Sequence, residues 1–309
     1  MQAQDYEHWE CRVVDDHSTD ESAALVQSFA ERDARIFLHN NAGMGIIDAL
    51  QTGMAYTQGN AISRFDADDV MPEGRLELLA QALQESKPGT VVTGMVQYFA
   101  EYPITPGYQR YENWLNTVNK EGKHRQNMYR ECVIASPNWL LRRDDFERAG
   151  GFANLEYPED YDVTLRWYAA GYAFKVLPEV TLLWREHSMR TSRNAAEYKQ
   201  KAFFELKIKR FLQIEKGEVP LVLWGTGQKG KLAAKILRRH QVSFYWIGQH
   251  PEKYPHGLHE VPVYSHQKIA ELTMPQVLVA VYPPALERER IENFLKSLAL
   301  REGKHYWYL

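Results

Sequence analysis

The sequence has only two cysteines among its 309 residues, Cys11 and Cys132. Two distant cysteines give neither a disulfide framework nor the paired spacing of a zinc site. We therefore expect a chain that works in a reducing cytoplasm.

Long hydrophobic runs and an excess of one charge are also missing. No apolar stretch reaches the ~18 residues of a membrane-spanning helix, and the start, MQAQDYEHWE, lacks the basic and then apolar pattern of a signal peptide. The 37 Lys and Arg nearly balance the 40 Asp and Glu. Nucleic-acid binding needs a basic surface, so this balance argues against nucleic acid as the main partner.

The first half of the chain alternates short apolar runs with helical patterns. The expected strands are Cys11–Asp15, Arg35–Leu38, Ala61–Phe65 and Thr90–Val96, and the expected helices are one capped by Ser18 or Thr19, Gly45–Thr57 and Arg75–Glu85. This alternation predicts an α/β fold with a mainly parallel sheet covered on both faces. Ligands then bind beyond the carboxyl ends of the strands.

The rest of the chain predicts a second domain. Residues 101–123 read as a surface segment with a short helix, and the boundary is expected after residue 216, giving domains 1–216 and 217–309. Further expected elements are helix Glu159–Ala170 closed by Gly171, strand Val180–Arg185, helix Ala195–Lys216, strand Pro220–Trp224, helix Lys231–His240, strands Ser243–Ile247 and Gln276–Val281, and helix Glu287–Leu298.

The acidic cluster Asp66-Ala-Asp68-Asp69 ends one of the predicted strands. Carboxylates this close stay ionised together only when a cation or suitable donors offset them. A hard divalent ion, Mg²⁺ or Mn²⁺, prefers such oxygen ligands and also bridges a diphosphate. The alternative is a solvent-facing cluster that caps the following helix.

Asp15 and Asp16 end the first predicted strand in a similar way. A carboxylate there can accept a hydrogen bond from a base or from a ribose hydroxyl. The alternative is helix capping alone.

Two further groups lie in the second half of the first domain. Glu159 and Asp160 open a helix, where the helix dipole stabilises acids, but one of them could also serve as a general base. His187 follows a strand end, with Arg190 and Arg193 close behind, so the histidine and both arginines are candidates for a metal–diphosphate site.

The order and spacing of these groups resemble family-2 glycosyltransferases. The resemblance covers nearly all of residues 4–194 and is carried by the segments VVDDHSTDES, ALQTGMAYTQGNAISRFDADDVMPEGRLE, ASPNWLLRRDDFERAGGF, YPEDYDVTLRWYAAG and WREHSMRTSRN. It implies the GT-A fold, a nucleotide-sugar donor, a saccharide or lipid-linked acceptor, and inverting transfer in cell-surface polysaccharide or glycoconjugate synthesis.

The same resemblance implies roles for individual residues. Residues like Asp15 and Asp16 hold the base and ribose of the donor nucleotide, which Asp66 also contacts. Residues like Asp66 and Asp68 hold Mg²⁺ or Mn²⁺, and a residue like His187 completes that environment. One carboxylate of the pair Glu159 and Asp160 acts as the base, and we favour Asp160.

The sequence departs from the family pattern in two places. No arginine stands in Ala49-Leu-Gln-Thr-Gly53, where many relatives have one. Relatives also begin about 30 residues earlier, with an apolar strand that lies centrally in the sheet, so we expect a mixed sheet without that first strand. An inactive remnant that serves as a binding or scaffold module is therefore an alternative to an active enzyme.

The second domain carries Gly225-x-Gly227-x-x-Gly230 between a strand and a helix, which is the setting of a dinucleotide-binding loop. The acid expected after the next strand is missing, so the glycines could serve the turn alone, and an NAD-dependent oxidoreductase is the weaker reading. The segment resembles the small Rossmann-like domain appended to some glycosyltransferases, with a role in packing, oligomerisation or docking. Helix Ala195–Lys216 could lie on a membrane surface or pack between the domains.

Overall fold

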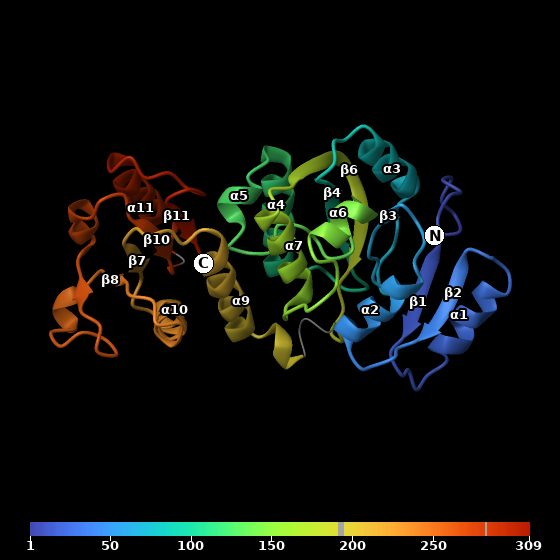
Figure 1. Ribbon diagram of the computed structural model, residues 1–309, viewed down its shortest axis with the longest axis horizontal. Coiled ribbons are helices and arrows are strands. Elements are labelled where there is room, and N and C mark those ends of the chain that lie inside the picture. Colours follow the sequence, from blue (N-terminus) through green and yellow to red (C-terminus); the bar gives the residue numbers. More distant parts are fainter. Residues whose placement is uncertain (191–194, 282) are drawn as a thin grey trace. The chain divides into compact units, whose positions relative to one another are not determined.

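The computed structural model describes residues 1–190, 195–281 and 283–309 (Figure 1). The chain forms two compact units, Met1–Gly122 with Ile134–Arg190, and Lys123–Val133 with Thr191–Leu309. This division differs from the one expected from the sequence, which has a single boundary after residue 216. Helix α9 (Gln200–Ile214) packs on helix α10 (Gln228–Arg239) of the second unit, and the segment Lys123–Val133 joins that unit as well.

The first unit has the expected alternation of strands and helices. Its elements are β1 (Cys11–Asp15), α1 (Ser22–Ala30), β2 (Ile36–Asn40), α2 (Ile46–Tyr56), β3 (Ala61–Ile62), α3 (Arg75–Gln84), β4 (Thr90–Phe99), α4 (Pro106–Glu121), β5 (Leu141–Arg142), α6 (Arg143–Arg148), α7 (Glu159–Ala169) and β6 (Ala173–Arg185).

Parallel pairing dominates the first unit. Strand β1 pairs with β2 and β4 with β6, both parallel, whereas the short strands β3 and β5 are antiparallel. Helix α2 packs on β1, α1 on β2, and α3 and α4 on β4. The mixed α/β arrangement predicted from the sequence is confirmed.

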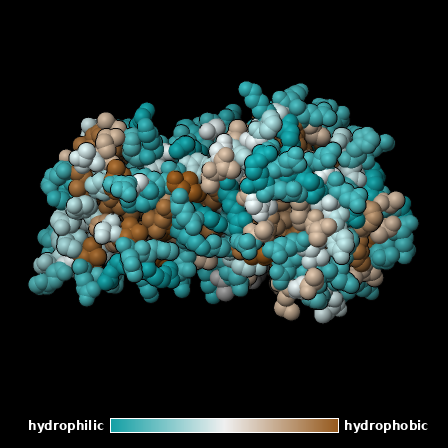
Figure 2. All heavy atoms as spheres, in the orientation of Figure 1, coloured by the Kyte–Doolittle hydropathy of each residue, from teal (hydrophilic) through white to brown (hydrophobic). Residues whose placement is uncertain are grey.

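Burial is uneven along the first unit. Residues 1–61 contain no buried hydrophobic side chain, and the first one in the chain is Ile62. Leu25 of α1 is 58% exposed, and Figure 2 shows apolar side chains at the surface around α1 and β2. By contrast, β4 is almost continuously buried. The core of this unit therefore lies around β4, β6, α3, α4 and α7.

Three expectations for individual elements are wrong. Helix α1 begins at Ser22 rather than beside Ser18 or Thr19, because Asp20 accepts the Ser22 backbone N–H at 2.9 Å. Residues 101–123 form the 16-residue helix α4 rather than a short one. Strand β3 ends at Ile62, and residues 63–65 continue as irregular chain.

The second unit is built on a five-stranded parallel sheet with strand order β11-β10-β7-β8-β9, which is Rossmann-like as expected. None of the helices that the structure describes is long and apolar enough to cross a bilayer. Besides α9 and α10, the elements are α5 (His124–Asn127), η1 (Ala196–Tyr198), β7 (Leu221–Trp224), β8 (Tyr245–Ile247), η2 (Pro251–Lys253), β9 (Val263–Tyr264), η3 (His266–Glu271), β10 (Gln276–Val279), α11 (Ala285–Ser297) and β11 (Tyr306–Tyr308).

The segment Lys123–Val133 contributes to the core of this second unit. Tyr129 is fully buried and meets Phe211 and Trp307 edge-to-face, with ring centroids 5.7 and 6.4 Å away. The Nε of Arg125 donates to the carbonyl of Gly303 at 2.8 Å. These contacts explain why the segment belongs to this unit although it lies between the two parts of the first unit in sequence.

The three glycines between β7 and α10 have different surroundings. Gly225 has φ +130, a conformation that L-residues rarely adopt. A Cβ on Gly230 would lie 1.9 Å from the carbonyl oxygen of Gly225, whereas one on Gly227 would meet no atom within 4 Å. Gly225 and Gly230 are therefore required by the tight turn and the close helix packing, and Gly227 is not.

We expect Gly230→Ala to destabilise the second unit by about 3 kcal/mol, because the methyl group meets backbone that cannot move aside. Gly227→Ala, with φ −74 and open space, should cost less than ~1 kcal/mol. Urea denaturation of both variants tests this pair. Equal stabilities would contradict the packing role of Gly230.

Candidate active site

The acidic loop, residues 66–69, is held against the end of β6. The backbone of Val70 exchanges hydrogen bonds with Leu183, at 3.0 and 3.1 Å. Arg185 then donates its Nε to the carbonyl of Asp68 at 2.6 Å and its backbone N–H to Asp69 at 2.8 Å. The loop is therefore fixed by a strand that follows it by more than a hundred residues.

His187 lies beside this loop, as the sequence predicts. Its Nε2 is 2.8 Å from Oδ2 of Asp68. Both side chains are part-exposed, at 34% for His187 and 40% for Asp68. The structure thus brings together an imidazole and a carboxylate from distant segments.

Asp69 differs from the other two carboxylates of the loop. Burial raises its pKa, the backbone N–H of Arg185 lowers it, and the charges of Asp66 and Asp68 raise it, which together give a pKa of about 7. A proton on Asp69 relieves the repulsion between three adjacent carboxylates.

Arg64 is the residue of this site that the sequence reasoning missed. Its Nε donates to Oδ1 of Asp66 at 2.7 Å, and its Nη1 donates to Oε1 of Glu159 at 2.8 Å. The signal was present, because a charged side chain inside a predicted buried strand, Ala61–Phe65, needs a partner. The side chain therefore connects the acidic loop to the first turn of α7.

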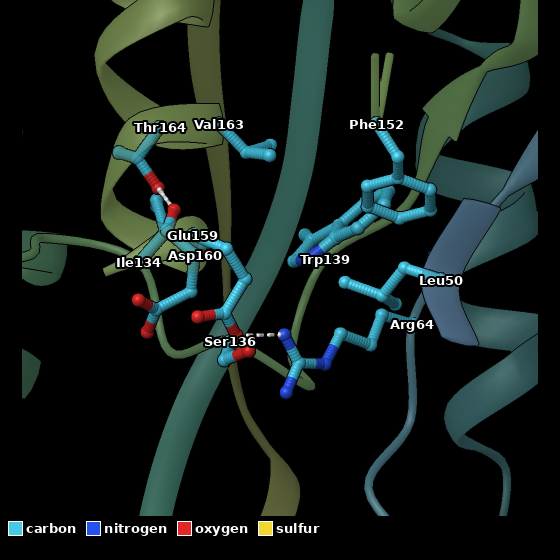
Figure 3. A pocket seen from close by; sticks show the side chains of 10 residues that line it. All are labelled: Leu50, Arg64, Ile134, Ser136, Trp139, Phe152, Glu159, Asp160, Val163 and Thr164. Carbon is cyan, nitrogen blue, oxygen red and sulfur yellow. Dashed lines mark hydrogen bonds and ion pairs between the residues drawn. The ribbon is translucent and has the colours of Figure 1, made fainter. Parts of the chain in front are cut away.

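The carboxylate pair Glu159 and Asp160 lies at a small pocket beside Arg64. Figure 3 shows the Arg64 guanidinium pointing at Glu159 across this pocket. The remaining lining residues are Leu50, Ile134, Ser136, Trp139, Phe152, Val163 and Thr164.

An aromatic cluster fixes the apolar side of the pocket. Trp139 stacks on Phe146 with ring centroids 5.6 Å apart and meets Trp167 of α7 edge-on at 5.0 Å. Phe152 meets Phe146 edge-on at 4.8 Å. A rigid apolar wall next to carboxylates lowers the local polarity and affects their ionisation.

Asp160 shows this effect. Burial raises its pKa well above the ordinary value, and the neighbouring Glu159 raises it further, while Arg64 and the backbone N–H of Tyr161 lower it. The resulting pKa of about 7 suits a group that takes up a proton near neutral pH. Glu159 is instead buried in its ion pair with Arg64.

We expect Asp160→Asn to raise the melting temperature increasingly as the pH rises from 5 to 8. A carboxyl whose folded-state pKa is raised contributes stability below its unfolded pKa of 3.8, and loses that contribution as the pH approaches 7. At pH 8 the gain should be roughly 2–4 °C. The control is Asp144→Asn, at an exposed position in the first turn of α6, which should not show this gain. A gain that does not depend on pH would contradict the raised pKa.

Asp15 and Asp16 lie in a separate loop at the end of β1. Asp16 accepts hydrogen bonds from Asn41 Nδ2 at 2.6 Å and from the Gly45 backbone N–H at 3.0 Å. Asp15 is near the Ser18 backbone N–H at 3.3 Å. Asp16 therefore orders the loop after β2, and Asp15 is left with the weaker contact.

Of the two candidate arginines, Arg190 points inward. It donates to Oε2 of Glu186 at 3.2 Å and lies over the Trp184 ring, 5.0 Å from its centroid. Its side chain is only 13% exposed. Arg193 lies outside the described residues.

The donor chemistry of Asp66, Asp68 and His187 fits a divalent cation such as Mg²⁺ or Mn²⁺. Asp66 and Asp68 are 28% and 40% exposed and can reach solvent. Within the described part of the chain, no three His, Cys, Asp or Glu side chains already converge on one point. Binding an ion here would require these side chains to turn, with Asp66 using the oxygen that Arg64 leaves free.

Comparison with known proteins gives a family match for the N-terminal part of the chain. Residues 1–150 match the family described as "Glycosyl transferase family 2". The relative named "Probable glycosyltransferase YdaM" from Bacillus subtilis is 27% identical over 217 residues, which are 65% of this chain and 51% of that protein. The "Amylovoran biosynthesis glycosyltransferase AmsE" from Erwinia amylovora is 26% identical over 47% of this chain and 51% of that protein. The chain thus spans about half the length of these relatives.

A solved structure supports the fold. TarS 1–349 of S. aureus, crystallised with UDP-GlcNAc, superposes with a TM-score of 0.52 at 17% identity, over 77% of this chain and 66% of that one. This likeness confirms the predicted GT-A architecture. The family match, and not this likeness, places residues 1–150 in glycosyl transferase family 2.

Proposed function

We propose that this chain transfers a sugar, with inversion, from a nucleotide-sugar donor to a hydroxyl of a saccharide or lipid-linked acceptor. The observation that carries the proposal is the position of Asp160. Its carboxyl group has a raised pKa, lies at a pocket, and is connected through Glu159 and Arg64 to the acidic loop.

In this proposal Asp160 is the general base of a single displacement. The acceptor oxygen attacks the anomeric carbon and gives its proton to Asp160. The bond from that carbon to the diphosphate oxygen breaks, and its electron pair leaves with the nucleoside diphosphate. Because attack and departure occur on opposite faces, the anomeric configuration inverts.

The acidic loop and the first β-strand would hold the donor. Asp66, Asp68 and His187 would bind Mg²⁺ or Mn²⁺, which neutralises the charge of the leaving diphosphate when bound. Asp15 and Asp16, at the end of β1, would bind the base and ribose. Arg190 would reach the diphosphate only if it exchanges its contact with Glu186, and Arg193 is proposed for the same role.

A thermal-shift screen with nucleotide sugars and Mn²⁺, followed by a transfer assay, tests this function. UDP-GlcNAc is the first donor, because it is bound in the structurally similar TarS. A donor that raises the melting temperature only with Mn²⁺ and releases nucleoside diphosphate supports the enzyme. A donor that binds without any release would favour the alternative of a binding or scaffold module.

The relative AmsE, by its name, serves amylovoran biosynthesis. We propose for this chain a role in polysaccharide synthesis at the cytoplasmic face of the membrane. The total charge of the chain is near neutral because its two units carry net charges of opposite sign. Residues 123–133 and 191–309 hold 22 Lys and Arg against 12 Asp and Glu. Helix α10 contains no acidic residue and exposes Lys231, Lys235, Arg238 and Arg239. Such a helix attracts anionic lipid head groups, by about 1 kcal/mol for each basic residue near the surface.

We expect the chain to float with vesicles that contain phosphatidylglycerol and to remain unbound with neutral vesicles. Lys231→Glu combined with Lys235→Glu should reduce the bound fraction strongly. Lys253→Glu with Lys304→Glu changes the net charge equally at other exposed positions, and should have a smaller effect. Equal losses in both pairs would show that overall charge, rather than α10, causes the binding.

For the Gly225-x-Gly227-x-x-Gly230 loop we propose a structural role in the turn. The contacts of Gly225 and Gly230 support this role. Calorimetric binding of NAD(H) to the full chain would contradict it and revive the oxidoreductase alternative.

A further inference from the structure

We infer that Arg64 is a positioning residue that fixes the acidic loop relative to the general base. The catalytic part of this inference rests on the proposed function. Its structural part rests on the contacts of Arg64 alone. Arg64 is the side chain through which two segments almost a hundred residues apart are joined at the pocket.

The geometry suits a bridge between two carboxylates. The guanidinium donates through Nε to Oδ1 of Asp66 and through Nη1 to Oε1 of Glu159, at 2.7 and 2.8 Å. A planar guanidinium presents both donors in a fixed relation, which a lysine ammonium on a flexible chain does not. The distance between the two carboxylates is therefore set by one rigid group.

Burial makes this bridge stiff. The Arg64 side chain is 10% exposed and that of Glu159 is 2% exposed. Charge-assisted hydrogen bonds away from water are stronger than those on the surface, because solvent competes less for the donors and acceptors. Glu159 thus acts as the anchor of α7, and not as a second base.

The bridge separates the roles of the two acids at the start of α7. Glu159 keeps its partner Arg64, while Asp160, the next residue, faces the same pocket without an ion pair among the described residues. A base must stand within hydrogen-bond reach of the acceptor hydroxyl while the acidic loop holds the diphosphate. A misplacement of about 1 Å between these two parts is enough to slow transfer about 100-fold.

The test compares Arg64→Lys with the wild-type chain. Lysine keeps the positive charge beside Glu159 but cannot bridge both carboxylates. We expect kcat to fall about 10- to 100-fold, while KM for the donor changes less than threefold and the melting temperature stays near that of the wild type. Full activity of Arg64→Lys would overturn the inference, because charge balance alone would then be sufficient.

A second pair of variants covers the case in which Arg64→Lys folds poorly. Arg64→Met with Glu159→Gln removes the two most buried charges of the bridge, and the carboxylate that then loses its partner, Asp66, is 28% exposed and can be solvated. Glu159→Gln alone is the control. A folded double variant with wild-type kcat would also overturn the inference.

Hydrogen exchange gives a readout that does not depend on transfer. Peptides covering residues 66–70 and 159–163 should both lose protection, by about tenfold, in Arg64→Lys, since both segments lose their anchor. Unchanged protection in the two segments would overturn the inference. If Arg64→Lys loses this protection but the wild-type chain transfers no sugar, the bridge exists and the proposed function is refuted instead.

Discussion

Asp160→Asn should reduce kcat of sugar transfer by roughly 10²–10⁴-fold, which is the range that a general base contributes. Asparagine keeps the size of the side chain but cannot take the proton of the acceptor hydroxyl. Because Asp160 does not hold the donor in the proposed site, the dissociation constant of the donor measured by calorimetry should change little.

Asp144→Asn is the matched control for this substitution. Asp144 also lies in the first turn of a helix, α6, but it is exposed and does not line the pocket. It should retain full activity. If Asp160→Asn keeps more than half of the wild-type kcat, the base is another group.

Asp68→Ala should lower metal-dependent transfer at least about 100-fold. Asp68 contacts His187 at 2.8 Å, so its loss removes one proposed ligand and also frees the imidazole. Loss of a group that only orients a ligand already costs about 10–100-fold in metal affinity or activity. Because His187 is also a proposed ligand, His187→Ala should lower transfer by a factor similar to that of Asp68→Ala.

Titration with Mn²⁺ measures this effect, as the concentration that gives half-maximal activity. The control is Glu73→Ala, an exposed acid that follows the loop closely in sequence. Asp68→Ala should need more metal than the wild type, and Glu73→Ala the same amount. A wild-type chain that is fully active in EDTA would contradict the metal site at Asp66, Asp68 and His187.

Local sequence patterns predicted most of the elements and the place of the acidic groups. Strand β1 occupies the range expected for it, and helix α7 ends one residue earlier than expected. Gly171 follows α7 with φ +75, as its predicted capping role requires. These features depend on neighbours in sequence, so periodicity and capping signals are sufficient to find them.

Helix α4 is longer than predicted, although it carries the same kinds of signal. Pro106 stands at its start and Gly122 ends it in a left-handed conformation, and both are ordinary helix signals. The tyrosines and asparagines between them obscure the apolar positions Leu115 and Val118, which are buried against the rest of the unit.

Contacts between distant segments could not be read from local patterns. The partners of Arg64 lie 2 and 95 residues away, and only the nearer one is visible in the sequence motif. In the same way, Tyr129 belongs to the core of the second unit because Phe211 and Trp307 surround it. Each contact joins segments whose meeting depends on the whole fold.

The anomeric configuration of the product is the most direct test of a single displacement assisted by Asp160. The chain is incubated with Mn²⁺, an accepted nucleotide sugar and its acceptor, and the coupling constant of the anomeric proton in the product is measured by NMR. We predict the configuration opposite to that of the donor, and no such product from Asp160→Asn. A product that retains the donor configuration would contradict the mechanism.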